Sequence, residues 1–260
     1  MISVLLNVAP DRGHEARLQA ALALAKVHGG RITCVQTVYA MPVPADPGGA
    51  TAEAEGPVQL EEAADEFRRI VEAGLDGEGV DWTWLRFYGD PATILVERSR
   101  LADVIVMSAN DSFPPIARVA LHTSTPVLAV RQQDPNFSPE RPALVAWNGS
   151  VSAAHAVRGA LPMLEAMQPV HVLSVDEDEG ALPASLVQDY LVGHRVESEV
   201  HRRASDGEPV VDAILEFADE IGTGMIVAGA FGHNRLRELL LGSATSALLE
   251  KSSRPLLLAH

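Results

Sequence analysis

Residues 225–232 read MIVAGAFG, and this stretch decides the fold. An apolar run is followed by two glycines, Gly229 and Gly232, that are separated by two residues. Such a pattern is typical of a buried strand that ends in a tight turn, because glycine permits close backbone approach and positive φ. Nine residues later, Gly242-Ser243 precede residues 244–250, which we expect to form a helix. The segment therefore predicts a strand, a glycine-containing loop and a helix in succession.

The same order of elements extends in both directions and occurs twice. In the second half we expect strands near 144–146, 170–175, 195–202, 225–227 and 256–258, with helices at 153–164, 186–192, 209–218 and 244–250. In the first half we expect strands near 4–8, 32–39, 82–87, 104–107 and 127–130, again alternating with amphipathic stretches. Alternation of helices with almost continuously apolar strands predicts an α/β fold, with a parallel sheet covered on both faces.

Local signatures indicate a duplication. Gly89-Asp90-Pro91 is echoed by Gly207-Glu208-Pro209, each before a helix, and Asp90 is a good N-cap residue. Pro126 and Pro255 each open the fifth strand of a half, and these strands are candidates for edge pairing between domains or between chains. The polar, proline-containing stretch 132–142 is the expected linker. We therefore predict domains at residues 1–134 and 141–260.

The two halves differ after their fourth strands. Val227 and Pro255 are 28 positions apart, whereas Val106 and Pro126, the equivalent pair, are only 20 apart. The first half lacks eight residues there, and residues 108–113 contain no glycine. Loops tolerate such deletions when they carry no function. In the second half, by contrast, the free N–H groups at a helix start beside Gly242-Ser243 could receive a phosphate.

Gly229 and Gly232 are separated by two residues, and nine residues then precede Gly242-Ser243. This spacing resembles the ATP-binding signature of the universal stress protein family. The resemblance covers nearly the whole chain and is strongest in the second half. It implies two flavodoxin-like or Rossmann-like three-layer domains, each with a five-stranded parallel sheet of order 3-2-1-4-5, packed as a pseudo-dimer. It also implies an ATP site in the C-terminal domain only.

The resemblance assigns nucleotide contacts where positions match. The phosphate loop corresponds to Gly229, Gly232, Gly242, Ser243 and Ala244. The adenine pocket corresponds to Val175 and Ala228, and the end of the first strand contributes Ala146 and Asn148.

Asn148 stands where the family usually has an aspartate, so it keeps a hydrogen-bond acceptor and loses the charge. In the first half the matching position is expected to be Pro10.

Composition limits the other possibilities. A net charge of −15 argues against a nucleic-acid partner or an anionic membrane surface. No membrane span or signal peptide is expected, and the single cysteine, Cys34, suits a reducing compartment, so we expect a cytoplasmic protein. The nine histidines are scattered without a recognisable ligand spacing, so we expect no protein-bound metal; Mg²⁺ could be held by the phosphates of ATP.

The leading hypothesis is an adenine-nucleotide-binding protein of the stress response, in which ATP is a regulatory ligand read by a protein partner that the sequence does not identify. No residue is placed as a base for an attacking water, so we assign no catalytic residue. Two alternatives stay open: a slow ATPase or nucleotide-dependent transferase, and a structural module with a vestigial site. The chain could also form a homodimer.

Overall fold

The computed structural model describes residues 1–39, 57–109, 115–132, 137–176, 180–230 and 243–260. The first half contains, in order, β1 (Ser3–Val8), α1 (His14–Val27), β2 (Arg31–Val38), α2 (Pro57–Leu75), β3 (Asp81–Tyr88), α3 (Pro91–Arg98), the 3-10 turn η1 (Ser99–Leu101), β4 (Val104–Ser108), α4 (Ile116–Ala120) and β5 (Val127–Val130). The second half repeats this with β6 (Ala143–Trp147), α5 (Val151–Leu164), β7 (Val170–Val175), α6 (Ala184–Gly193), β8 (Ser198–Arg203), α7 (Val210–Glu220), β9 (Met225–Gly229), α8 (Ser243–Lys251) and β10 (Leu256–Ala259).

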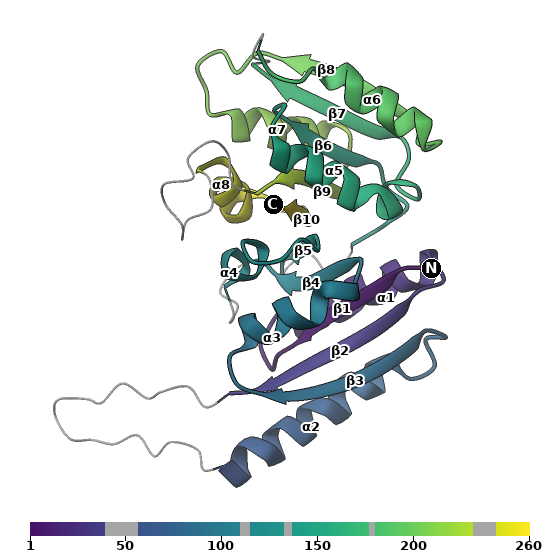
Figure 1. The fold of residues 1–260 in the computed structure, drawn as a ribbon, viewed down its shortest axis with the longest axis vertical. Coiled ribbons are helices and arrows are strands. Elements are labelled where there is room, and N and C mark those ends of the chain that lie inside the picture. The colour runs from purple at the N-terminus through teal and green to yellow at the C-terminus, as the bar shows by residue number, and fades with distance from the viewer. Residues whose placement is uncertain (40–56, 110–114, 133–136, 177–179, 231–242) are drawn as a thin grey trace, which may run out of the picture.

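The strands form one ten-stranded sheet in the order β3-β2-β1-β4-β5-β10-β9-β6-β7-β8. Each half therefore has the expected order 3-2-1-4-5, and the two halves meet where β5 and β10 pair (Figure 1). That pair is antiparallel, with Leu257 opposite Leu128, whereas the pairs within each half are parallel. The predicted α/β fold is confirmed, and of the two possibilities left open for the fifth strands, the structure shows pairing between the halves.

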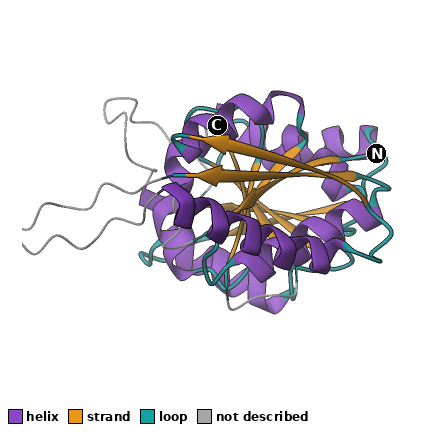
Figure 2. Ribbon diagram, turned by 90° about the horizontal axis from the view of Figure 1, so that it is seen from below, coloured by secondary structure: helices purple, strands orange, loops and turns teal. Residues whose placement is uncertain are grey.

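Helices cover both faces of this sheet (Figure 2). One apolar core includes side chains of α1, α2, α5 and α6, and a second includes side chains of α3, α4, α7 and α8. Each apolar strand contributes alternate residues to the two cores; in β6, for example, Val145 faces the first and Leu144 the second. Burial on both faces explains why these strands read as continuous apolar runs.

Side chains also join the two halves beside the β5–β10 pair. Arg131, directly after β5, donates from Nη2 to the carbonyl oxygen of Leu249 near the end of α8, at 2.6 Å. Gly159 of α5 lies against the ring of Pro126, so closely that a Cβ on Gly159 would be 2.4 Å from Pro126 Cγ. The boundaries that we expect at residues 134 and 141 stay predictions, because the halves share one sheet.

Two local predictions can be checked directly. Asp90 is the N-cap of α3, and its carboxylate accepts from the backbone N–H of Thr93 at 2.9 Å, as expected. The third strand of the second half begins at Ser198 rather than at 195, because Arg195 has a φ of 62° and belongs to the preceding turn. Within the described residues, no helix is both long and apolar enough to span a membrane.

Candidate functional site

The candidate site lies at the carboxyl ends of β6 and β9. These parallel neighbours have Ala146 and Ala228 as registered partners. The helix that follows β6 packs on one face of the sheet, and the helix that follows β9 packs on the other. In open α/β sheets ligands bind at such a point, because the two connections diverge and leave a crevice between them.

The loop after β6 is held by its own side chains. Asn148 accepts, through Oδ1, a hydrogen bond from the backbone N–H of Ser150 at 3.2 Å. Ser150 is in turn the N-cap of α5, and its Oγ accepts from the backbone N–H of Ala153 at 3.1 Å. These two hydrogen bonds fix the N-terminus of α5 beside the carboxyl ends of the strands. The positive end of the helix dipole favours an anion at that N-terminus.

The end of β9 touches the start of α5. A Cβ on Gly229 would be 2.5 Å from the backbone nitrogen of Ala153 and 2.8 Å from Ser152 Oγ, so only glycine allows this approach. From the other side, Thr245 Oγ1 of α8 donates to the carbonyl oxygen of Gly229 at 3.1 Å. The beginnings of two helices therefore converge on Gly229.

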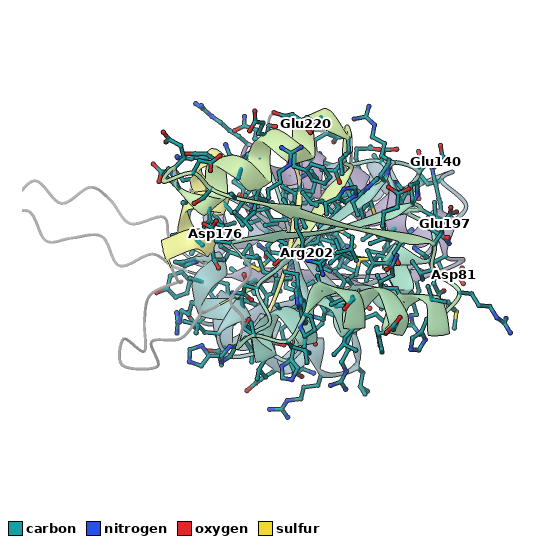
Figure 3. All side chains as sticks on the ribbon, turned by 90° about the horizontal axis from the view of Figure 1, so that it is seen from above. Asp81, Glu140, Asp176, Glu197, Arg202 and Glu220 are labelled. Atoms are coloured by element: carbon teal, nitrogen blue, oxygen red, sulfur yellow. The ribbon has the colours of Figure 1, made fainter. Side chains whose placement is uncertain are left out.

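The neighbouring strand β7 ends beside this crevice at Val175. The next residue, Asp176, has a φ of 50°, and its Oδ1 accepts from the backbone N–H of Ser205 at 2.9 Å. The hydrogen bonds from Ser205 hold the pKa of Asp176 below its ordinary value. Figure 3 shows Asp176 at the opposite end of the molecule from Glu197 and Glu140, which mark the other ends of the strands.

The structure brings together Ala146, Asn148, Ala228 and Gly229 from the predicted set, with Val175 one strand away. Ser243 and Ala244 open α8, where Ala244 is exposed. Gly232 and Gly242 lie outside the described residues. The sequence did not single out Ser150 and Ser152. A serine before a helix, such as Ser150, indicates an N-cap, but nothing local predicts that Ser152 lies against Gly229.

The equivalent crevice of the first half is filled by Arg17. This side chain donates from Nε to the carbonyl oxygen of Asn7 and from Nη2 to that of Ala9, both at 2.9 Å. Its Nη1 lies 2.8 Å from Asp11 Oδ1 and also donates to Ser108 Oγ at the end of β4. Burial lowers the pKa of Arg17, and the Asp11 carboxylate opposes this shift. The guanidinium thus bridges β1 and β4 where the second half has its candidate site.

The match of Pro10 to Asn148 is wrong. The residue that makes the same local bond as Asn148 is Asp11, whose Oδ1 accepts from the backbone N–H of Gly13 at 2.7 Å. The loop before α1 is two residues longer than the loop before α5, which shifts the register between the halves. The first half therefore keeps an aspartate, but that aspartate pairs with Arg17.

Comparisons with known proteins agree with this architecture. Residues 140–260 match the model of the universal stress protein family. A universal stress protein from Archaeoglobus fulgidus superimposes with a TM-score of 0.78 at 20% identity, over 99% of this chain and 97% of its own. A protein from Pseudomonas aeruginosa UCBPP-PA14, assigned to the same family, gives a TM-score of 0.62 at 15% identity, over 100% and 93%. Among curated proteins, none matches the chain in sequence.

Proposed function

We propose that this chain, whose residues 140–260 are a universal stress protein domain, binds ATP at the carboxyl ends of β6 and β9 as a regulatory ligand in the stress response. Family membership and the glycine spacing support a nucleotide, and the convergence of two helix starts on Gly229 supports an anionic group. The sheet orders of both halves are the same, so the proposal depends on what differs between them.

One observation carries this proposal: the contrast between the two crevices. Arg17, the fourth residue of α1, fills the crevice of the first half, and its side chain is only 1% exposed. The fourth residue of α5 is Ala154, whose methyl group cannot reach the strand ends in this way. The strand end itself carries Ser108 in the first half and Gly229 in the second. At these two positions, the second half thus lacks the long and polar side chains that fill the crevice of the first half.

In this proposal, Gly229, Gly232, Gly242, Ser243 and Ala244 hold the phosphates, and Val175 and Ala228 line the adenine pocket. Ala146 and Asn148 lie beside the nucleotide, and Mg²⁺ is held mainly by phosphate oxygens. Because the Asn148 oxygen already accepts from Ser150, its role is to shape the loop and offer its amide N–H groups. The chain itself contributes binding and orientation. We assign no catalytic residue, and we expect at most slow hydrolysis. The cytoplasmic location stays a proposal.

The test begins with denaturation of freshly purified protein and identification of any released nucleotide by chromatography. Thermal unfolding with and without Mg-ATP then follows for the wild type and for Gly242→Glu, with Ser108→Ala in the first half as the matched control. We expect one ATP per chain, and a stabilisation by ATP that Gly242→Glu abolishes and Ser108→Ala retains. No bound nucleotide and no stabilisation of the wild type would contradict the proposal and favour the structural-module alternative.

Gly229 is a poorer choice of variant, because a Cβ there meets the backbone of α5 and would disturb packing as well as binding. The enzymatic alternative has its own signature: a burst of ADP or AMP that Gly242→Glu abolishes. A regulatory ligand predicts that bound ATP is released intact.

A further inference from the structure

A second cluster with ligand chemistry lies on the outer strands of the second half. Within the part of the chain that the structure describes, His171 of β7, and Glu199 and His201 of β8, have ligand atoms that lie close enough together to hold a metal ion. His171 and Glu199 are registered partners, and His201 follows Glu199 by two residues, so all three side chains project from the same face of the sheet. Scattered positions in the sequence become neighbours through strand pairing.

The spacing of the three ligand atoms suits a small divalent ion. His171 Nδ1 lies 3.0 Å from His201 Nε2, and Glu199 Oε2 lies 3.8 Å from the first atom and 3.7 Å from the second. In the plane of these three atoms, the point equidistant from them lies about 2.0 Å from each, which is the length of a Zn–N or Zn–O bond. Two imidazoles and one carboxylate are also a donor set that Zn²⁺ prefers.

We propose that His171, Glu199 and His201 bind one divalent transition-metal ion, with Zn²⁺ the best match to the donors and distances. The side chain of His171 is 12% exposed, that of His201 30% and that of Glu199 60%, so solvent reaches the site from the Glu199 side. Water can therefore supply a fourth ligand, and a small shift of the ion out of the plane of the three protein atoms toward that water gives the tetrahedral arrangement that Zn²⁺ prefers. The expectation from the sequence that the protein binds no metal is replaced by this proposal.

The surroundings fix the two rings. Phe217 of α7 packs against both imidazoles, with ring centroids 6.1 Å from His171 and 4.7 Å from His201. The nearby Arg203 lies over the same phenyl ring, with Cζ 4.7 Å from the ring centroid, and pairs with Glu220, with Nη1 3.1 Å from Oε1. Its positive charge is thus already compensated. Burial, and next the neighbouring His201, lower the pKa of His171, and the Glu199 carboxylate opposes this shift.

The first half provides an internal comparison. By strand register, the positions of His171, Glu199 and His201 correspond there to Thr33, Thr83 and Leu85. None of these three residues is a strong metal ligand. Since the same sheet forms with these residues, the fold itself does not require the cluster. The site also stands apart from the nucleotide crevice, because four strand residues, about 13 Å, separate His171 from Val175.

An ordinary hydrogen bond would also account for the shortest distance. His171 Nδ1 and His201 Nε2 at 3.0 Å suit an N–H···N bond, in which one ring donates and the other accepts. Metal binding instead needs both nitrogens without protons and also needs the Glu199 carboxylate. Removal of Glu199 therefore separates the two explanations, since a bond between the two imidazoles does not depend on it.

The experiment uses the full chain, treated with EDTA and dialysed, and titrates Zn²⁺ by calorimetry. The variants are Glu199→Gln and the pair Glu199→Thr with His201→Leu, which introduces residues that the first half already tolerates in its sheet. His122→Gln, an exposed histidine of the first half, is the matched control. Circular dichroism and thermal unfolding without metal confirm that each variant folds.

We expect one Zn²⁺ per wild-type chain. Both variants should bind roughly 100-fold more weakly, because a direct ligand matters at least as much as the outer partners whose loss costs 10–100-fold. His122→Gln should bind as the wild type does. Cobalt(II) should give the visible spectrum of a tetrahedral site in the wild type and lose it in Glu199→Gln. The absence of a single site in the wild type, or equal affinity in Glu199→Gln, would overturn the proposal.

Discussion

Arg17 Nη1 and Asp11 Oδ1 lie 2.8 Å apart at the place in the first half where the second half has its candidate nucleotide site. The arginine belongs to α1, and the aspartate belongs to the loop before that helix. The ion pair therefore closes the crevice between β1 and β4 from within one domain. The first half thus has a shorter segment without glycine after β4 and a crevice filled by Arg17, and its sheet has the same strand order as that of the second half.

The first prediction concerns this buried charge. Replacement of Arg17 by methionine removes its bonds to two backbone carbonyls and leaves Asp11 without its partner, so we expect a loss of about 3 kcal/mol in the free energy of unfolding. Urea denaturation of the wild type and the variant measures this difference in the free energy of unfolding. Arg12→Met is the matched control, because Arg12 is exposed and should change stability by less than about 0.5 kcal/mol. Equal effects of the two changes would show that the cluster does not stabilise the first half.

The second prediction transfers the filled crevice to the other half. Ala154→Arg places a guanidinium at the helix position of Arg17, from which it can reach the ends of β6 and β9. We expect Mg-ATP to stop stabilising this variant in thermal unfolding, while the fold persists, because Ala154 is only partly buried. His155→Arg adds the same group one residue later on an exposed position and should leave nucleotide binding unchanged.

Much of the fold could be predicted from the sequence, because burial on both faces gives strands a distinctive apolar pattern. The strands predicted at residues 104–107 and 225–227 are confirmed as the first four residues of β4 and the first three of β9. The sequence does not decide whether the two halves pair edge to edge, since the apolar fifth strands could equally pair between chains. Only the structure shows that β5 and β10 pair with each other, as antiparallel neighbours within one chain.

The candidate sites were less predictable than the fold. Their residues come from elements far apart in the sequence and become neighbours only when the strands pair. No local pattern distinguishes Arg17 from other helix residues, and its partner Ser108 is 91 positions away. His171 and His201 are likewise 30 positions apart and have no local ligand spacing. The match of Pro10 failed for a different reason, because a loop-length difference of two residues cannot be located without the hydrogen bonds of the loop.

The third prediction tests the junction between the halves. Within a helix, alanine is generally more favourable than glycine. At Gly159, however, a Cβ would overlap the ring of Pro126. We therefore expect Gly159→Ala to destabilise the protein by about 1–3 kcal/mol, as overpacking does. In Gly193→Ala, at the exposed end of α6, nothing lies within 4 Å of the new Cβ, and this variant should gain about 0.5 kcal/mol. Opposite signs in chemical denaturation would establish that Pro126 contacts α5 in solution.

The fourth prediction concerns pH and the start of α3. Hydrogen bonds from Thr93, aided by Arg118, hold the pKa of Asp90 below its ordinary value of 3.8. Since the folded pKa lies below the unfolded one, the stabilisation is complete above about pH 5 and is lost as the pH falls through the folded value. Asp90→Asn keeps an oxygen acceptor for the cap and removes only the charge.

We expect Asp90→Asn to be less stable than the wild type by about 0.5 kcal/mol at pH 7, since the ion pair with Arg118 is largely exposed. The difference should shrink as the pH is lowered and disappear once Asp90 is protonated in both states. Urea titrations of both proteins between about pH 7 and pH 3 measure it. A difference that stays constant over this range would mean that the charge of Asp90 contributes nothing and that the cap alone stabilises α3.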